Sequence, residues 1–153
     1  HHEVKQENLS EIVDRALVSF RRSSLSSGVD VEVKAPGKAD ALADALELEL
    51  LIVNLLKNAA AASKDSREKL ISVQLSEEAN EWLLSVSDHG QVISDKLLSR
   101  LSHPAKSFSD GLGLGLSICR LIAENHGGKL TFKPNNSKGL IVTLHLPKAN
   151  KEI

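Results

Sequence analysis

The stretch from Asp40 to Ser63 constrains the fold more than any other part of the chain, because it contains neither glycine nor proline. Alanine and leucine dominate it, and both residues favour the helix strongly. Its apolar side chains would occur on nearly all sides of a helix, which is typical of a helix buried inside a domain. We therefore predict one long central helix against which the other elements pack.

Helices and strands alternate along the rest of the chain. Asn8 is placed to cap an amphipathic helix that reaches Phe20 and stops at a serine- and glycine-rich cluster. Apolar residues alternate with polar ones in several short segments, which indicates half-buried strands. The predicted strands span about 29–33, 69–76, 81–88, 130–133 and 140–146, with a short helix at 96–101 and a longer one at 114–125 that His126-Gly127-Gly128 ends.

The length and composition indicate one globular domain. The chain has 153 residues, 41% of them apolar and 25% charged, which excludes disorder as the main state. A net charge of -1 and only four aromatic residues argue against nucleic acid as a ligand. The lone Cys119 is expected to fill the core. His1 and His2 resemble the end of a purification tag, so we expect residues 1–7 to be a tag or linker remnant and residues 8–150 to form the domain.

Two asparagines lie on one face of the predicted central helix. Asn54 and Asn58 are four residues apart, so their amides project from the same side among leucines and alanines. Two buried amides without partners would cost roughly several kcal/mol. We expect a polar ligand to face them, and the alternative is that neighbouring backbone or water satisfies both.

Asp88 stands where the strand pattern calls for an apolar residue. Trp82, Leu84 and Val86 point to one face of their strand, and a period of two places Asp88 on that same face. Its carboxylate can accept a hydrogen bond from a base with an exocyclic amino group, such as adenine. The alternative is a turn or capping role, since Gly90 follows closely.

A glycine-rich segment, Gly111-Leu-Gly-Leu-Gly115-Leu, leads directly into a helix. Backbone amides in such a segment and at a helix N-terminus can bind phosphate groups. The segment lacks the lysine and serine or threonine of a P-loop, and Leu116 occupies the third glycine position of the dinucleotide fingerprint. An anion site of another kind is therefore expected.

In this order, the three features resemble the GHKL ATPases, and among them the ATP-binding catalytic domain of sensor histidine kinases. The resemblance rests on Asn54-Leu-Leu-Lys-Asn58, Ser87-Asp-His-Gly90, the segment from Gly111, and the closing Leu144-His-Leu-Pro147. It implies an α/β (α+β) fold, a two-layer sandwich in which a mixed sheet packs on helices. It also implies that residues 89–110 form a lid over ATP.

The resemblance also assigns site residues and cofactors. It implies ATP and Mg²⁺ as cofactors, Asn54 and Asn58 as catalytic residues, Asn58 as the metal ligand and Asp88 as the adenine contact. The nucleotide-binding residues that it implies are Asn54, Asn58, Asp88, Gly90, Gly111, Leu112, Gly113, Leu114, Gly115 and Leu116.

The reaction implied is transfer of the ATP γ-phosphoryl group to a histidine on a separate dimerisation domain of the same parent protein. A response regulator receiver domain would be the next partner. We expect the isolated domain to be a monomer from a homodimeric parent, located in the cytoplasm, with the parent either free or anchored in the inner membrane. His2-Glu3-Val4-Lys5 resembles only the start of an acceptor motif. The remaining histidines are expected to have structural or solvent roles.

Three departures from the family pattern keep other functions open. Val92 replaces the second glycine of the first glycine motif, Ala61 replaces a common basic residue, and Lys106 or Arg100 would have to supply the basic residue of the lid. A docking module that binds nucleotide without phosphotransfer is one alternative, and an anti-sigma-factor serine kinase is another. An ATP-driven clamp would need a glutamate in place of Asn54, because an amide cannot accept the proton of a water molecule.

Overall fold

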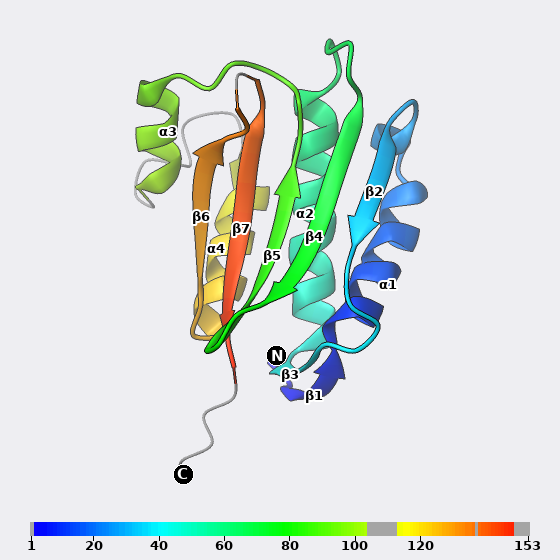
Figure 1. Cartoon of the computed structure of the whole chain (residues 1–153), viewed down its shortest axis with the longest axis vertical. Helices are drawn as coiled ribbons and strands as arrows, with labels where there is room; N and C mark the ends of the chain where they lie inside the picture. Colours follow the sequence, from blue (N-terminus) through cyan, green and yellow to red (C-terminus); the bar gives the residue numbers. More distant parts are fainter. Residues whose placement is uncertain (1, 104–112, 137, 149–153) are drawn as a thin grey trace.

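The computed structural model describes residues 2–103, 113–136 and 138–148, and these form a five-stranded sheet packed on helices (Figure 1). The strand order is β2-β4-β5-β7-β6, with β2 and β4 parallel and the other neighbours antiparallel. The predicted mixed sheet is therefore confirmed. The strands are β2 (Asp30–Lys34), β4 (Leu70–Glu77), β5 (Glu81–Ser87), β6 (Lys129–Pro134) and β7 (Leu140–Pro147).

The helices cover one face of this sheet (Figure 1). The helices α1 (Leu9–Arg21), α2 (Ala45–Ala62) and α4 (Gly113–Asn125) lie side by side behind it, and α3 (Asp95–Ser102) lies beside β6. A single helical turn, η1 (Ser24–Ser26), follows α1. No helix among the described residues is long and apolar enough to span a bilayer.

The core lies between α2 and the inner face of the sheet. The inward-pointing residues of β4 and β5 are all buried, and Val73 is paired with Val86 across the two strands. They are Ile71, Val73 and Leu75 of β4, and Trp82, Leu84 and Val86 of β5. Cys119 is buried too, as expected for a core residue, and its desolvation raises the pKa of the thiol to about 12. The buried residues of α2 are Leu48, Leu51, Ile52, Leu55, Leu56, Ala59 and Ala60.

The predicted start of the central helix is wrong. Asp40–Ala43 form a strand, β3, whose side chains alternate between exposed and buried and which pairs antiparallel with β1 (Lys5–Asn8). Asp44 then caps α2, because its Oδ1 accepts a hydrogen bond from Glu47 N at 3.0 Å. Residues 5–7, which were expected to belong to a tag or linker, pair with β3 in this two-stranded sheet.

Asp44 also fastens the N-terminal segment to the domain. Its Oδ2 accepts a hydrogen bond from Glu3 N, and the residue is only 4% exposed. Burial raises the pKa of this carboxyl, but the amide bonds from Glu3 and Glu47 outweigh that effect and hold the pKa below its ordinary value. A depressed pKa adds stability above the ordinary value, and that stability is lost as the pH falls through the folded-state pKa.

We predict that Asp44→Ala lowers the free energy of unfolding at neutral pH by about 2 kcal/mol, because it removes the cap and leaves the Glu3 amide unpaired. Urea denaturation measures this change, and the difference from wild type should shrink in strong acid. Asp40→Ala is the matched control, since Asp40 is exposed and contacts only Lys38 among the ion pairs of the described residues. Equal losses in the two variants would contradict the assigned role.

Candidate functional site

A cavity of about 370 Å³ lies between α2, α3, α4 and the inner face of the sheet. Aliphatic side chains and Phe132 form most of its wall, which suits a flat apolar ligand. Its side-chain amides and carboxylate come from three residues at one end of the helix layer and sheet: Asn58, Asp88 and Gln91.

Asp88 is the buried charge of this cavity. It directly follows β5, lies on the inner face as predicted and is 5% exposed. Its Oδ1 accepts hydrogen bonds from Gly90 N at 2.8 Å and Leu140 N at 3.3 Å. Burial raises the pKa of the carboxyl, and these two amide bonds offset only part of that effect. Because both bonds end on Oδ1, the second oxygen has no such bond within the described residues.

Gly90 brings the loop after Asp88 against the end of α2. A Cβ atom at this position would lie 2.3 Å from the carbonyl oxygen of Ala62, so any side chain would push the loop away from the helix. The family resemblance assigns this glycine to nucleotide binding, and that role stays a prediction. Its close approach to the backbone of α2 holds one wall of the cavity in place.

Asn54 and Asn58 are half-buried, so the prediction that both amides are enclosed in the core is wrong. They face the side of α2 that borders the cavity and α4. Asn54 Nδ2 donates to Leu50 O one turn earlier at 3.1 Å, while Asn58 lines the cavity. Asn54 Nδ2 thus has a backbone partner, and the polar ligand expected to face the two asparagines stays a prediction.

Only part of the glycine-rich segment lies within the described residues. Gly113 and Leu114 begin α4, whereas Gly111 and Leu112, like Lys106 of the predicted lid, lie outside the described residues. A Cβ atom at Gly115 would lie 3.3 Å from Asn54 Oδ1, so this glycine lets α4 approach the catalytic asparagine expected on α2. Leu116 is buried and lines the cavity.

Arg120 ties α4 to α3, which the sequence did not reveal. Its Nη2 donates to the carbonyl oxygen of Leu101 near the end of α3, and its guanidinium carbon lies 5.1 Å from the centroid of the Phe132 ring. Burial lowers the pKa of this guanidinium, and the nearby Glu124 opposes that effect. Leu101 and Phe132 both line the cavity, so Arg120 supports its outer wall.

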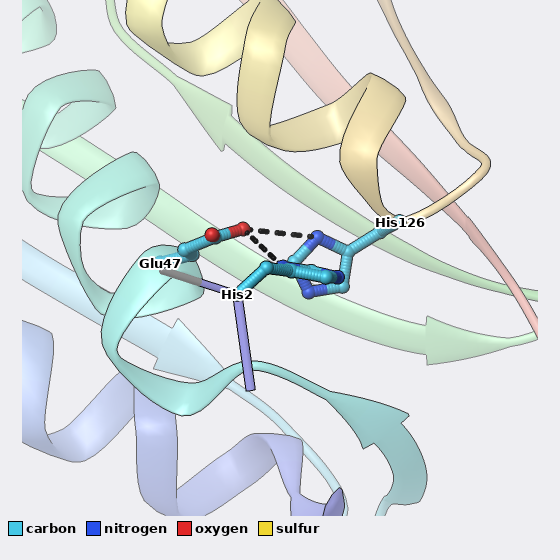
Figure 2. Close-up of side chains that lie close together, drawn as sticks. All are labelled: His2, Glu47 and His126. Carbon is cyan, nitrogen blue, oxygen red and sulfur yellow. Dashed lines mark hydrogen bonds and ion pairs between the residues drawn. The ribbon is translucent and has the colours of Figure 1, made fainter. Parts of the chain in front are cut away.

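One cluster among the described residues has the composition of a metal site: His2, Glu47 and His126 (Figure 2). Glu47 Oε1 lies 2.9 Å from His2 Nδ1 and 3.9 Å from His126 Nδ1. However, His126 Nε2 accepts from Asp44 N at 3.0 Å, and its Nδ1 lies 2.9 Å from Ile122 O. Because Nε2 is the acceptor, Nδ1 carries the proton and has no lone pair for an ion. The cluster is a structural link between α2 and the end of α4.

The departures from the family pattern are structurally compatible with the site. Val92 is 73% exposed, and it is absent from the described non-glycine residues with positive φ, so valine fits the loop without backbone strain. Ala61 lines the cavity, so the cavity wall lacks a cation at this position.

Comparison with known proteins gives a consistent result. Residues 43–150 match the family model of the histidine kinase-, DNA gyrase B- and HSP90-like ATPases. The chain is 28% identical to the adaptive-response sensory kinase SasA of Prochlorococcus marinus, over 97% of this chain and 42% of that protein. It is 30% identical to the sensor protein FixL of Bradyrhizobium diazoefficiens, over 97% of this chain and 30% of that protein. It thus spans less than half the length of either relative.

Solved structures agree with the sequence comparison. The catalytic domain of the histidine kinase ThkA, in a nucleotide-free form, is 27% identical and superposes with a TM-score of 0.79, covering 97% of this chain and 99% of that one. The mycobacterial sensor histidine kinase MprB is 25% identical, with a TM-score of 0.75. The chain therefore belongs to the family of histidine kinase-, DNA gyrase B- and HSP90-like ATPases, the GHKL superfamily, as a domain of the histidine kinase type.

Proposed function

We propose that this domain binds Mg-ATP in the cavity between its helices and sheet and transfers the γ-phosphoryl group to a histidine on a separate domain of its parent protein. The observation that carries the proposal is Asp88, a buried carboxylate with one oxygen held by backbone amides at the wall of an apolar cavity. Membership of an ATPase family supports ATP as the nucleotide.

The base end of the site is chemically suited to adenine. A buried carboxylate is unfavourable unless it is hydrogen-bonded, and its second oxygen needs a donor. The exocyclic amino group of adenine is such a donor, and the aliphatic wall provides contact for the faces of the ring. Gln91 lies at the same end of the cavity and offers a second polar group.

The phosphate end would lie toward Asn54, Asn58 and the first turn of α4. Amide oxygens are suitable ligands for Mg²⁺, so Asn58 would hold the ion, which neutralises phosphate charge when bound. The backbone amides that start α4 and the positive end of its dipole favour an anion in the same place. We carry over Gly111, Gly113 and Gly115 as phosphate-segment residues on the family resemblance.

The chain's own contribution to transfer would be positioning and charge stabilisation. The amide of Asn54 cannot remove a proton from water, which favours phosphotransfer over the hydrolysis expected of an ATP-driven clamp. One relative is named a sensory kinase and another a sensor protein, which supports a dimerisation domain of the parent as acceptor and a receiver domain as the next partner. A homodimeric parent and a cytoplasmic location belong to the same proposal.

We predict that Asp88→Asn weakens binding of a non-hydrolysable ATP analogue about tenfold to a hundredfold, because a hydrogen bond to a charged acceptor is replaced by a weaker one. Titration calorimetry measures the change. Asp30→Asn, at an exposed position of β2, is the control and should bind as wild type does. Unchanged affinity in Asp88→Asn would refute the assigned base contact.

The same substitution should not destabilise the fold. An amide oxygen can keep both backbone bonds, and the raised pKa means that ionised Asp88 opposes folding. In the unfolded chain this carboxyl ionises at a lower pH than in the folded domain, so the contribution of Asp88 to stability falls as the pH rises above the ordinary value of 3.8. Asp88→Asn removes this contribution. Urea denaturation across acid pH should therefore show its free energy of unfolding rising relative to that of wild type as the pH increases. A large loss of stability would contradict this account.

We predict that Asn58→Ala abolishes Mg-dependent phosphotransfer to a supplied dimerisation domain while leaving the fold intact, because it removes an oxygen ligand from a half-buried position. Radiolabelled transfer from ATP measures the activity. Asn80→Ala, in the exposed β4–β5 turn, is the matched control and should retain wild-type rates. Wild-type transfer by Asn58→Ala would exclude it as the metal ligand.

A further inference from the structure

We propose that the turn between β6 and β7 positions Asp88, and that Asn135 is the side chain through which it does so. This inference rests on the proposed function, in which Asp88 contacts the base. The turn comprises Asn135, Asn136, Lys138 and Gly139 among the described residues, and it lies at the same end of the sheet as the end of β5 (Figure 1).

Asn135 bonds directly to the backbone of Asp88. Its Nδ2 donates to the carbonyl oxygen of Asp88 at 2.7 Å, the shortest bond that this aspartate makes with the turn. The backbone amide of Asn135 donates to Gly139 O at 2.9 Å, which holds the base of the turn closed. The side chain is therefore anchored on the turn before it reaches across to β5.

Leu140, the first residue of β7, makes two further hydrogen bonds with Asp88. Asp88 N donates to Leu140 O at 3.1 Å, and Leu140 N donates to Asp88 Oδ1 at 3.3 Å. Gly139 N donates to Gln91 O at 2.7 Å, so the turn also holds the residue beyond Gly90. The backbone on both sides of the carboxylate is thus fastened to one short segment.

A side-chain donor is needed here because the nearby backbone donors are already used. The amides of Asn135, Gly139 and Leu140 donate to Gly139 O, Gln91 O and Asp88 Oδ1 respectively. None of the three is left for the carbonyl oxygen of Asp88, and an unpaired carbonyl on a buried residue is unfavourable. The Asn135 amide supplies the missing donor.

Gly139 makes this approach possible. Its φ is 103°, a conformation that side chains disfavour, and a Cβ atom would lie 1.9 Å from the carbonyl oxygen of Asp88. The backbone of the turn at Gly139 therefore packs directly against Asp88, and the side-chain amide of Asn135 donates to the carbonyl oxygen of Asp88. With the peptide plane after Asp88 fixed in this way, Oδ1 stays on its amide donors and the second oxygen keeps one direction for a ligand.

A positioning residue must act through Asp88, and a double-mutant cycle tests this directly. Affinity for a non-hydrolysable ATP analogue is measured by calorimetry for wild type, Asn135→Ala, Asp88→Asn and the double variant, with thermal unfolding of each. We expect Asn135→Ala to weaken binding about fivefold, the loss of one hydrogen bond. In the Asp88→Asn background, Asn135→Ala should lower the affinity less than about twofold. The effects of two residues that act through one another are not additive.

Asn136→Gly is the matched control. It alters the same turn at a residue with φ of 53°, which glycine accommodates, and it should bind as wild type does. If Asn135→Ala does not fold, Asn135→Ser keeps a small polar residue in the turn but is too short to reach Asp88, and it replaces alanine in the cycle.

The outcomes separate this inference from the proposed function. Wild-type affinity in Asp88→Asn would overturn the base contact itself. Weakened binding in Asp88→Asn, together with wild-type affinity in Asn135→Ala, would overturn only the role of Asn135. If Asn135→Ala lowers the affinity by the same factor in the presence and absence of Asp88, the effect is a general structural one, and the positioning role is overturned.

Discussion

The burial of one carboxylate, Asp88, is the constraint around which the site is built. An ionised group that is 5% exposed opposes folding unless neighbouring dipoles stabilise it, and its raised pKa shows that they do so only in part. The fold accepts this cost at the end of β5, inside the sheet, where strands on both sides hold the backbone in register. The second oxygen of the carboxylate, which has no amide donor among the described residues, is available to a donor in the cavity.

Two glycines allow main-chain segments to pack closely in the region of Asp88. Gly90 allows the following loop to meet Ala62 at the end of α2, and Gly139 allows the β6–β7 turn to meet Asp88 itself. A Cβ atom at either position would lie within 2.3 Å of a carbonyl oxygen. The cavity wall therefore depends on main-chain contacts between segments that are distant in sequence, which explains why glycine is required there.

Periodicity predicted the five strands of the main sheet, the four α-helices and the placement of Asp88, because all of these depend on local geometry. It failed for Asp40–Ala43, where alanine and leucine favour a helix but pairing with β1 imposes a strand. Nothing in the spacing indicated Arg120 against Phe132, or Asn135 against Asp88, since each contact joins residues that only the finished fold brings together. The asparagines of α2 were placed correctly on one face, but their exposure depends on how α4 packs.

The proposed function divides the site into two ends with different tasks. The base end would be formed by the sheet and its turns, away from the reacting phosphate, so its contacts would contribute to binding without accelerating transfer. The other end is formed by Asn54 and Asn58 on α2 and by the start of α4, held together where Gly115 meets Asn54. Groups that stabilise charge as it moves between phosphate oxygens belong at this end, because only interactions that strengthen in the transition state raise the rate. In the proposed function, the sheet would therefore set where the nucleotide lies, and the helices would act on its phosphates.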